Sequence, residues 1–397
     1  MKRTLILFAL IMLVSGAFAQ FKKDRTAAYN AWQKPDLVKA KEAIDKAITY
    51  PEAATDTKVW FYRGGIYLDI QVSPAKAILG GPDALNIAYE AYLKARELDT
   101  KDDFKTEISA KLAAIGGEFF NEGITHFQQN NYDGAIPFFD KSINIAKENH
   151  AIDTLANYGL ALCYEKKAGA DKAFIDQAIE KYKYLVDIKM KEISIYTSLA
   201  NLYKEKGDID KATAVLDLGK TMYPGNSDLI ITEANIYIST NNHAKAVASL
   251  MTAKEKEPKN VSVLYAIGVT YDLLKNDTKL PEADRTKYFN AAVDGYKETI
   301  AVDSNYFDAL FNLGAIYYNK GGEVINEANK LPINETAKYD KMLADGNNYL
   351  NLALPYLEKC QLIQPTDKAT LVSLKEIYTR LNMKEKLTVV NEKLNNM

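Results

Sequence analysis

Cysteine and histidine are scarce in this chain, which has two cysteines and three histidines among its 397 residues. The histidines, His126, His150 and His243, stand apart, and none belongs to a zinc-binding spacing or to an oxygen-rich calcium loop. No pair of carboxylates can be assigned acid and base roles from its spacing. The sequence therefore offers no constellation for a metal, a cofactor or a catalytic reaction, and we expect a protein that is not an enzyme.

The two cysteines, Cys163 and Cys360, fall where we expect the interiors of helices. Exported proteins commonly pair their cysteines in disulfides. A disulfide requires Cα atoms within about 7 Å of each other, whereas these residues lie several repeat units apart in the assignment given below. We therefore predict two buried free thiols.

The chain also lacks an excess of charge of either sign. It has 50 basic and 52 acidic residues, which gives a formal net charge of −2. Proteins that bind nucleic acid or anionic lipid usually carry a clear basic surface, so we expect neither partner. Hydrophobic residues make up 47% and charged residues 26% of the chain, a composition typical of a folded protein with a large core.

Long apolar runs are missing from the body of the chain, and a shorter run stands at the N-terminus. Lys2 and Arg3 precede an apolar run from Leu5 to Val14, and the small-x-small sequence Ala17-Phe18-Ala19 follows it. A bilayer span takes about 20 apolar residues, so this run is too short, and the pattern is typical of a secretory signal peptide.

We predict that residues 1–19 are a signal peptide and that cleavage leaves Gln20 as the first residue. No cysteine follows this site, so we expect no lipid anchor. We also expect no membrane span in the rest of the chain. The protein should be exported, most simply to the periplasm, with secretion as the alternative.

What the chain does have is an internal repeat of 34 residues, seen when residues 193–226 are aligned with residues 227–260. Such a period is the sequence signature of a repeat architecture. The aligned columns pair Ala200 with Ala234, Tyr203 with Tyr237, Ala212 with Ala246, Leu216 with Leu250, Gly219 with Ala253, and Pro224 with Pro258.

This arrangement of small residues, tyrosine, large apolar residues and a late proline resembles the tetratricopeptide repeat. The resemblance implies an all-α fold, a right-handed α-solenoid of stacked pairs of antiparallel helices. Small residues let the paired backbones approach closely, and the proline ends the second helix because it lacks an amide donor. Each pair leaves an apolar face that only the next pair covers.

Weaker copies of the pattern extend over nearly all of residues 20–397, and we predict about eight to nine repeats in this segment. Insertions interrupt the period at residues 73–84, where Gly80-Gly81-Pro82 indicates a loop, and at residues 321–343. The longer insertion has two interpretations, a functional segment or an elongated helical hairpin that rests on its neighbour.

One stretch, Ala214-x-x-x-x-Gly219-Lys220-Thr221, fits a loose form of the phosphate-binding loop. Such a loop needs a strand before it and a helix that begins at Gly-Lys-Thr. Here the motif falls at the expected end of a helix, with Pro224 soon after, and the next copy of the repeat lacks it. We therefore predict that the chain binds no nucleotide.

The resemblance also implies a concave groove lined by the first helix of each pair, where a peptide or protein partner would bind. An apolar groove with scattered amides suits an extended or helical peptide, although some of its side chains could instead pack only on their neighbours. The implied groove residues are Phe61, Leu68, Phe120, Phe127, Tyr164, Asn201, Lys204, Asn235, Tyr265, Phe311 and Tyr318.

The whole pattern resembles exported bacterial tetratricopeptide-repeat proteins that lack an enzymatic domain. We therefore expect a non-catalytic interaction scaffold of the bacterial cell envelope. One alternative is a glycan-binding helical-repeat protein of the outer membrane, against which the missing lipid cysteine and the presence of only two tryptophans argue. Another is an enzyme whose site is built on the insertions.

Overall fold

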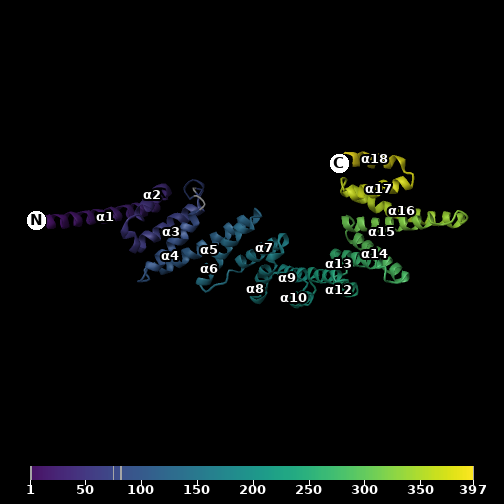
Figure 1. Cartoon of the computed structure of the whole chain (residues 1–397), viewed down its shortest axis with the longest axis horizontal. Helices are drawn as coiled ribbons and strands as arrows, with labels where there is room; N and C mark the ends of the chain where they lie inside the picture. Colours follow the sequence, from purple (N-terminus) through teal and green to yellow (C-terminus); the bar gives the residue numbers. More distant parts are fainter. Residues whose placement is uncertain (1, 75, 81–82, 397) are drawn as a thin grey trace. The chain divides into compact units, whose positions relative to one another are not determined.

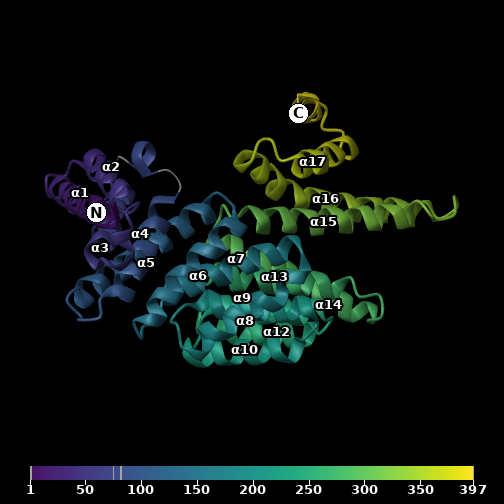
Figure 2. The same ribbon diagram turned by 60° about the vertical axis from the view of Figure 1, so that its left-hand side comes forward.

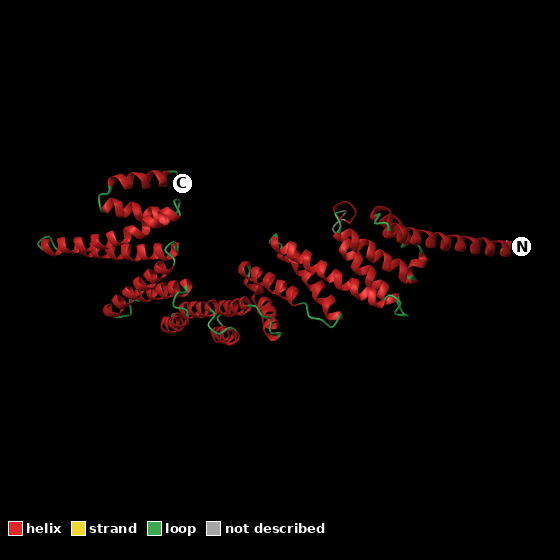
Figure 3. Ribbon diagram, turned by 180° about the vertical axis from the view of Figure 1, so that it is seen from behind, coloured by secondary structure: helices red, strands yellow, loops and turns green. Residues whose placement is uncertain are grey.

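The computed structural model describes residues 2–74, 76–80 and 83–396, and the side chains of residues 18–74, 76–79 and 83–396. Throughout these residues the chain consists of helices joined by loops, without a strand (Figure 3). The expected all-α helical-repeat fold is confirmed. The chain divides into two compact units, Met1–Lys191 and Glu192–Met397, a division that the 34-residue period does not indicate.

The first unit contains four successive helix pairs in its described residues (Figure 1). Short 3₁₀ turns at Pro51–Thr55 and Lys172–Phe174 precede the second pair and the last helix. The pairs are α1 (Lys2–Gln33) with α2 (Leu37–Ala47), α3 (Thr57–Val72) with α4 (Ala84–Leu98), α5 (Lys105–Gln128) with α6 (Tyr132–Glu148), and α7 (Thr154–Ala170) with α8 (Ile175–Asp187).

The described residues of the second unit form five helix pairs of the same kind. They are α9 (Ile193–Lys206) with α10 (Ile209–Met222), α11 (Ser227–Ser239) with α12 (His243–Lys256), α13 (Val261–Lys275) with α14 (Glu282–Val302), α15 (Phe307–Ala328) with α16 (Thr336–Ile363), and α17 (Lys368–Arg380) with α18 (Lys384–Asn395).

Polar residues immediately before several of the first helices determine where these helices begin. The side chain of Asn226 accepts a hydrogen bond from the backbone N–H of Leu229 at 3.1 Å, and Asn260 accepts one from Val263 at the same distance. Both bonds satisfy an amide that the first turn of a helix leaves without a partner. At the other end of α9, Gly207 adopts a left-handed conformation, with φ of 84°, and ends the helix.

The residues that coincide in the 34-residue alignment form the contact between paired helices. Ala200 and Ala212 are fully buried, as are their counterparts one repeat later. Gly219 allows α10 to pack closely on its partner α9 and on α11 of the next pair, because a Cβ atom there would lie 3.0 Å from Tyr196 and 2.9 Å from Leu229. The repeat pattern therefore records close packing between helices.

The insertion at residues 321–343 is an elongated helical hairpin. α15 continues to Ala328 and α16 begins at Thr336, so that the two helices extend beyond α14 and α17 (Figure 2). The helices cross closely, since a Cβ atom on Gly321 would lie 2.9 Å from the carbonyl oxygen of Gly346.

The insertion at residues 73–84 includes a π-helical turn at Lys76–Gly80. The Lys76 ammonium forms an ion pair with the Glu122 carboxylate of α5. Gly81 and Pro82, part of the predicted loop, lie outside the described residues.

The two cysteines are buried free thiols, as predicted. Cys163 belongs to the first unit and Cys360 to the second. Burial raises the pKa of each thiol to about 12, so both remain protonated and unreactive at neutral pH.

α1 is one continuous helix, and it includes the predicted signal peptide apart from Met1, which lies outside the described residues. Over the described part of the chain, no helix combines the length and the apolar character needed to cross a bilayer.

Candidate partner-binding surfaces

The first helices of successive pairs approach each other within each unit. Contacts join α1 to α3, α3 to α5 and α5 to α7 in the first unit, and α9 to α11, α11 to α13 and α15 to α17 in the second. Among the described residues, successive second helices approach each other less closely and are joined through long side chains, as in the ion pair of Arg96 on α4 with Glu148 on α6. The first helices therefore lie on the inner side of each unit, where a solenoid presents its binding surface.

Three of the expected groove residues lie together on this side of the first unit, and we call Phe120, Phe127 and Tyr164 the unit 1 patch. All three are partly buried and pack against a small core that includes Phe139 and Leu160. The Phe120 ring lies 5.9 Å from the Phe139 ring between centroids. Each side chain is thus supported from below by the core and keeps part of its surface exposed.

Phe61 and Leu68, by contrast, belong to the core of the first unit, with exposed fractions of 8% and 5%. The Phe61 ring lies 5.6 Å from the ring of Tyr92 and 4.9 Å from the ring of Phe104. Phe104 lies in the loop before α5, outside the repeat pattern, and helps to cover Phe61. For these two residues the groove assignment is wrong, because they pack on their neighbours and are not available to a partner.

Three further expected residues, Tyr265, Phe311 and Tyr318, form a second surface, which we call the unit 2 patch. They are partly buried against the core of the C-terminal helix pairs. The Asn312 side-chain amide donates a hydrogen bond of 3.1 Å to the Tyr265 hydroxyl. The Tyr318 hydroxyl donates to the carboxylate of Glu376 on α17. These bonds hold two of the three rings by their polar ends.

The phenol groups of the unit 2 patch are neutral at physiological pH. Burial, and then the hydrogen bond to Glu376, raises the pKa of Tyr318 to about 12. Burial also raises the pKa of Tyr265, and the Asp308 carboxylate adds to this effect. The patch therefore presents aromatic surface and neutral hydroxyl groups, and its tyrosine rings carry no phenolate charge.

The remaining expected residues, Asn201 and Lys204 on α9 and Asn235 on α11, supply polar groups. Asn201 and Lys204 are partly exposed, and Asn235 is exposed. Within the residues that the structure describes, these three side chains make no hydrogen bond or ion pair. Their amide and ammonium groups are thus available to the backbone of a partner.

Asn312 and Glu376, which orient the tyrosines, were not expected from the sequence. Asn312 follows a groove position by one residue, and Glu376 lies one repeat further along the chain. To predict these two residues from the sequence, one would have to know which side chains of successive first helices contact each other. The repeat pattern describes packing within a pair and gives no such information.

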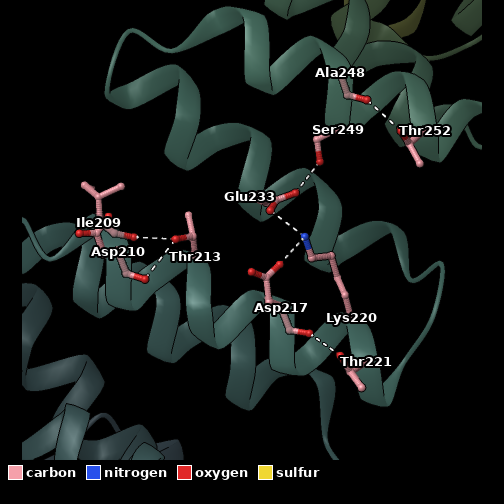
Figure 4. A network of polar contacts seen from close by, with 10 residues as sticks. All are labelled: Ile209, Asp210, Thr213, Asp217, Lys220, Thr221, Glu233, Ala248, Ser249 and Thr252. Atoms are coloured by element: carbon pink, nitrogen blue, oxygen red, sulfur yellow. Dashed lines mark hydrogen bonds and ion pairs between the residues drawn. The ribbon is translucent and has the colours of Figure 1, made fainter.

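The Gly219-Lys220-Thr221 motif lies in the last turn of α10, as predicted (Figure 4). The Lys220 ammonium lies 2.7 Å from Glu233 Oε1 and 2.9 Å from Asp217 Oδ1. Burial opposes its charge, but the bonds to Glu233 and Asp217 outweigh this effect and hold the pKa of Lys220 above its usual value.

Glu233 completes the network, since its second carboxylate oxygen accepts a hydrogen bond of 2.5 Å from the Ser249 hydroxyl. Glu233 is only 7% exposed. The network joins α10, α11 and α12 (Figure 4). A phosphate-binding loop presents free amides at the start of a helix, whereas the last turn of a helix presents free carbonyl groups. Here the lysine of the motif connects successive repeats.

Comparison with known proteins identifies the same kind of repeat. Residues 193–226, which span α9 and α10, match the tetratricopeptide repeat family. The superkiller complex protein 3 of Mus musculus is 24% identical over 189 residues, which are 44% of this chain and 12% of that protein. The Homo sapiens protein O-mannosyl-transferase TMTC3 is 21% identical over 319 residues, which are 75% of this chain and 33% of that protein.

The chain thus matches an eighth and a third of the length of these curated relatives. Among solved structures, a thermophilic TPR protein of Thermus thermophilus is similar, with 20% sequence identity and a TM-score of 0.35. That comparison covers 51% of this chain and 98% of the Thermus protein. The segment of α9 and α10 matches a tetratricopeptide repeat, and the described residues form an all-α helical-repeat protein.

Proposed function

We propose that this chain is a non-catalytic interaction scaffold that binds a peptide or protein partner on the first-helix side of its units. The observation that carries the proposal is the placement of partly exposed aromatic rings on the first helices of both units. Aromatic side chains at the centre of an interface commonly supply most of its binding energy. The free amides of Asn201 and Asn235 on neighbouring first helices would bond the partner's backbone.

The side chains of the unit 2 patch are also preorganised for binding. Tyr265 is held by Asn312, and Tyr318 by Glu376. Ordering a flexible side chain costs about 0.5–1.5 kcal/mol on association, and side chains that are already held avoid much of this cost. The chemistry of the patch favours a partner with apolar side chains and hydrogen-bonding backbone groups. The near-neutral charge of the chain argues against nucleic acid as the partner.

We further propose that the chain is exported from a bacterial cell and works in the periplasm, or else outside the cell. The basic start, the apolar run and the Ala17-Phe18-Ala19 sequence support this location. Packing is consistent with cleavage after Ala19, because Phe18 and Ala19 are exposed whereas Phe21 is 1% exposed. Mass spectrometry of the protein from its own cells would test this, and retention of residues 1–19 would contradict it.

The scaffold proposal is tested by crosslinking in cells, followed by affinity recovery of the chain. One variant changes the unit 1 patch by Phe120→Ser with Tyr164→Ser, and a second changes the unit 2 patch by Tyr265→Ser with Tyr318→Ser. The control is Ile333→Ser, which removes an apolar side chain that is 99% exposed at the tip of the α15–α16 hairpin. Cooperative thermal unfolding establishes that each variant is folded.

We expect one protein to be recovered with the wild type and with Ile333→Ser, and to be lost or reduced with at least one folded patch variant. Equal recovery with both patch variants would place binding on the second helices or on the hairpin, and the proposed surface would be wrong. An ATPase activity that Lys220→Ala abolishes would contradict the non-catalytic, nucleotide-free function.

A further inference from the structure

A cavity of about 420 Å³ lies where the elongated hairpin of the second unit meets the preceding helix pair. The end of α13 and the first half of α14 form one wall, and α15 and α16 form the other. Glu323, Val324, Glu327 and Met342, which belong to the insertion, line this second wall. The volume is within the range of about 300–1,000 Å³ that is usual for small-ligand sites. The insertion thus builds a cavity that the repeat pattern alone does not provide.

Part of the cavity lining is apolar and aromatic, beside the charged side chains that also line it. The rings of Phe289 and Tyr349 lie 6.3 Å apart in an edge-to-face arrangement, with an interplanar angle of 88°. Ile316, which is 3% exposed, lies beside them, and Val324 and Met342 complete the apolar lining. This surface suits the hydrocarbon part of a ligand, since burial of apolar area is favourable.

Arg285, in the first turn of α14, is the lining cation that lacks a partner. Its Nε atom is buried and has no hydrogen-bond partner, and the guanidinium makes no ion pair within the described residues. The other lining cations are paired, because Lys275 lies 2.8 Å from Asp272 and Lys320 lies 3.2 Å from Glu323. A buried donor without an acceptor is costly, and a bound anion would remove that cost.

We propose that this cavity binds a carboxylate carried on an apolar body, with the carboxylate on Arg285 and the body against Phe289 and Tyr349. The planar guanidinium fork matches a carboxylate through two parallel hydrogen bonds. The position of Arg285 near the N-terminus of α14 adds the favourable end of the helix dipole. Two sources share this chemistry, a small aliphatic or aromatic acid and the C-terminus of a polypeptide with an apolar last residue. The site is separate from the two patches and does not depend on the proposed scaffold function.

The test is a calorimetric titration of the full chain with 3-phenylpropanoate, and with its neutral amide as the matched ligand. The peptide acetyl-Ala-Ala-Phe, as free acid and as amide, represents the polypeptide source. The variant Arg285→Gln removes the guanidinium. The control Lys287→Gln removes an exposed cation on the same helix that does not line the cavity. Unfolding curves confirm that both variants are folded.

We expect at least one free acid to bind the wild type and Lys287→Gln with a dissociation constant of about 1 mM or below. Binding should weaken by about tenfold or more in Arg285→Gln and with the corresponding amide. Tighter binding of the peptide acid than of phenylpropanoate identifies a chain terminus as the source, and the reverse identifies a small acid. Three results would overturn the proposal. The acid could bind Arg285→Gln as tightly as it binds the wild type, or the amide could bind the wild type as tightly as the acid does. The third is that neither acid binds the wild type at about 10 mM.

Discussion

The side-chain amide of Asn312 lies 3.1 Å from the hydroxyl oxygen of Tyr265, and this hydrogen bond joins α15 to α13. A second bond, from the Tyr318 hydroxyl to Glu376, joins α15 to α17. Successive first helices of the second unit are therefore connected through the tips of their aromatic side chains. The same rings form the surface that we propose for partner binding, so the bonds that stabilise the unit also fix the geometry of that surface.

Replacing Asn312 with Ala should weaken both the unit and the patch. We expect the free energy of unfolding to fall by about 0.5–1.5 kcal/mol, because one partly buried hydrogen bond is lost. Urea unfolding measures this change, with Asn319→Ala as the control, since Asn319 is exposed on the same helix. An unchanged urea midpoint for Asn312→Ala would mean that the bond to Tyr265 contributes nothing.

Two adjacent glycines of the long hairpin should respond in opposite directions to alanine. At Gly321 a Cβ atom would meet the carbonyl oxygen of Gly346 at 2.9 Å, whereas at Gly322 it would meet nothing within 4 Å. We expect Gly321→Ala to destabilise the protein by about 1–3 kcal/mol through overpacking. Gly322→Ala should stabilise it by about 0.5–1 kcal/mol through helix propensity. Thermal unfolding compares them, and equal shifts would contradict the close crossing of α15 and α16.

The Lys220–Glu233 pair should behave as a buried connection between repeats. Lys220→Met leaves the Glu233 carboxylate, whose side chain is 9% exposed, without its cation, and we expect a loss of about 1–3 kcal/mol of unfolding free energy. The double variant Lys220→Met with Glu233→Gln should recover most of this loss, because the buried carboxylate is then gone and the Asp217 carboxylate, which also loses its cation, is 68% exposed. Additive effects in a double-mutant cycle would show that the two side chains do not interact.

The raised pKa of Tyr318 predicts a loss of stability in alkaline solution. An unfolded tyrosine ionises near pH 10, whereas Tyr318 in the folded protein keeps its proton up to about pH 12. Its contribution to stability is complete below pH 10 and is lost as the pH rises toward 12, since the unfolded state then binds fewer protons.

Thermal unfolding of the wild type and of Tyr318→Phe at pH 8 to 12 tests this dependence. The melting temperature of the variant should fall less steeply above pH 10, because phenylalanine has no proton to lose. Identical slopes for the two proteins would contradict the proposed environment of Tyr318.

The sequence allowed the helix pairs to be predicted because their packing repeats. Ala200, Ala212 and Leu216, identified from the 34-residue period, are fully buried. Small residues at the first two positions and a large apolar residue at the third have a local cause, the close packing of two neighbouring helices. Such a cause appears in every copy of the repeat and can therefore be read from the sequence alone.

The surface could be predicted only in part, because exposure depends on segments outside the period. Phe61 occupies an expected groove position, yet Phe104 from the loop before α5 covers it. The cavity at Arg285 depends on side chains of the insertion, such as Val324 and Met342, which no repeat pattern places. Contacts between a repeat and an irregular segment have no counterpart in other copies, so the sequence carried no signal for them.

The central claim, that a partner binds the first-helix side, is tested most directly by site-specific photocrosslinking in cells. One repeat supplies both probe positions, Asn235 on the first helix α11 and Met251 on the second helix α12, and both side chains are exposed. Because neither is in the core, a photoreactive residue at either position should leave the fold intact. Our account predicts a crosslinked partner from Asn235 and none from Met251. A crosslink from Met251 alone would contradict it.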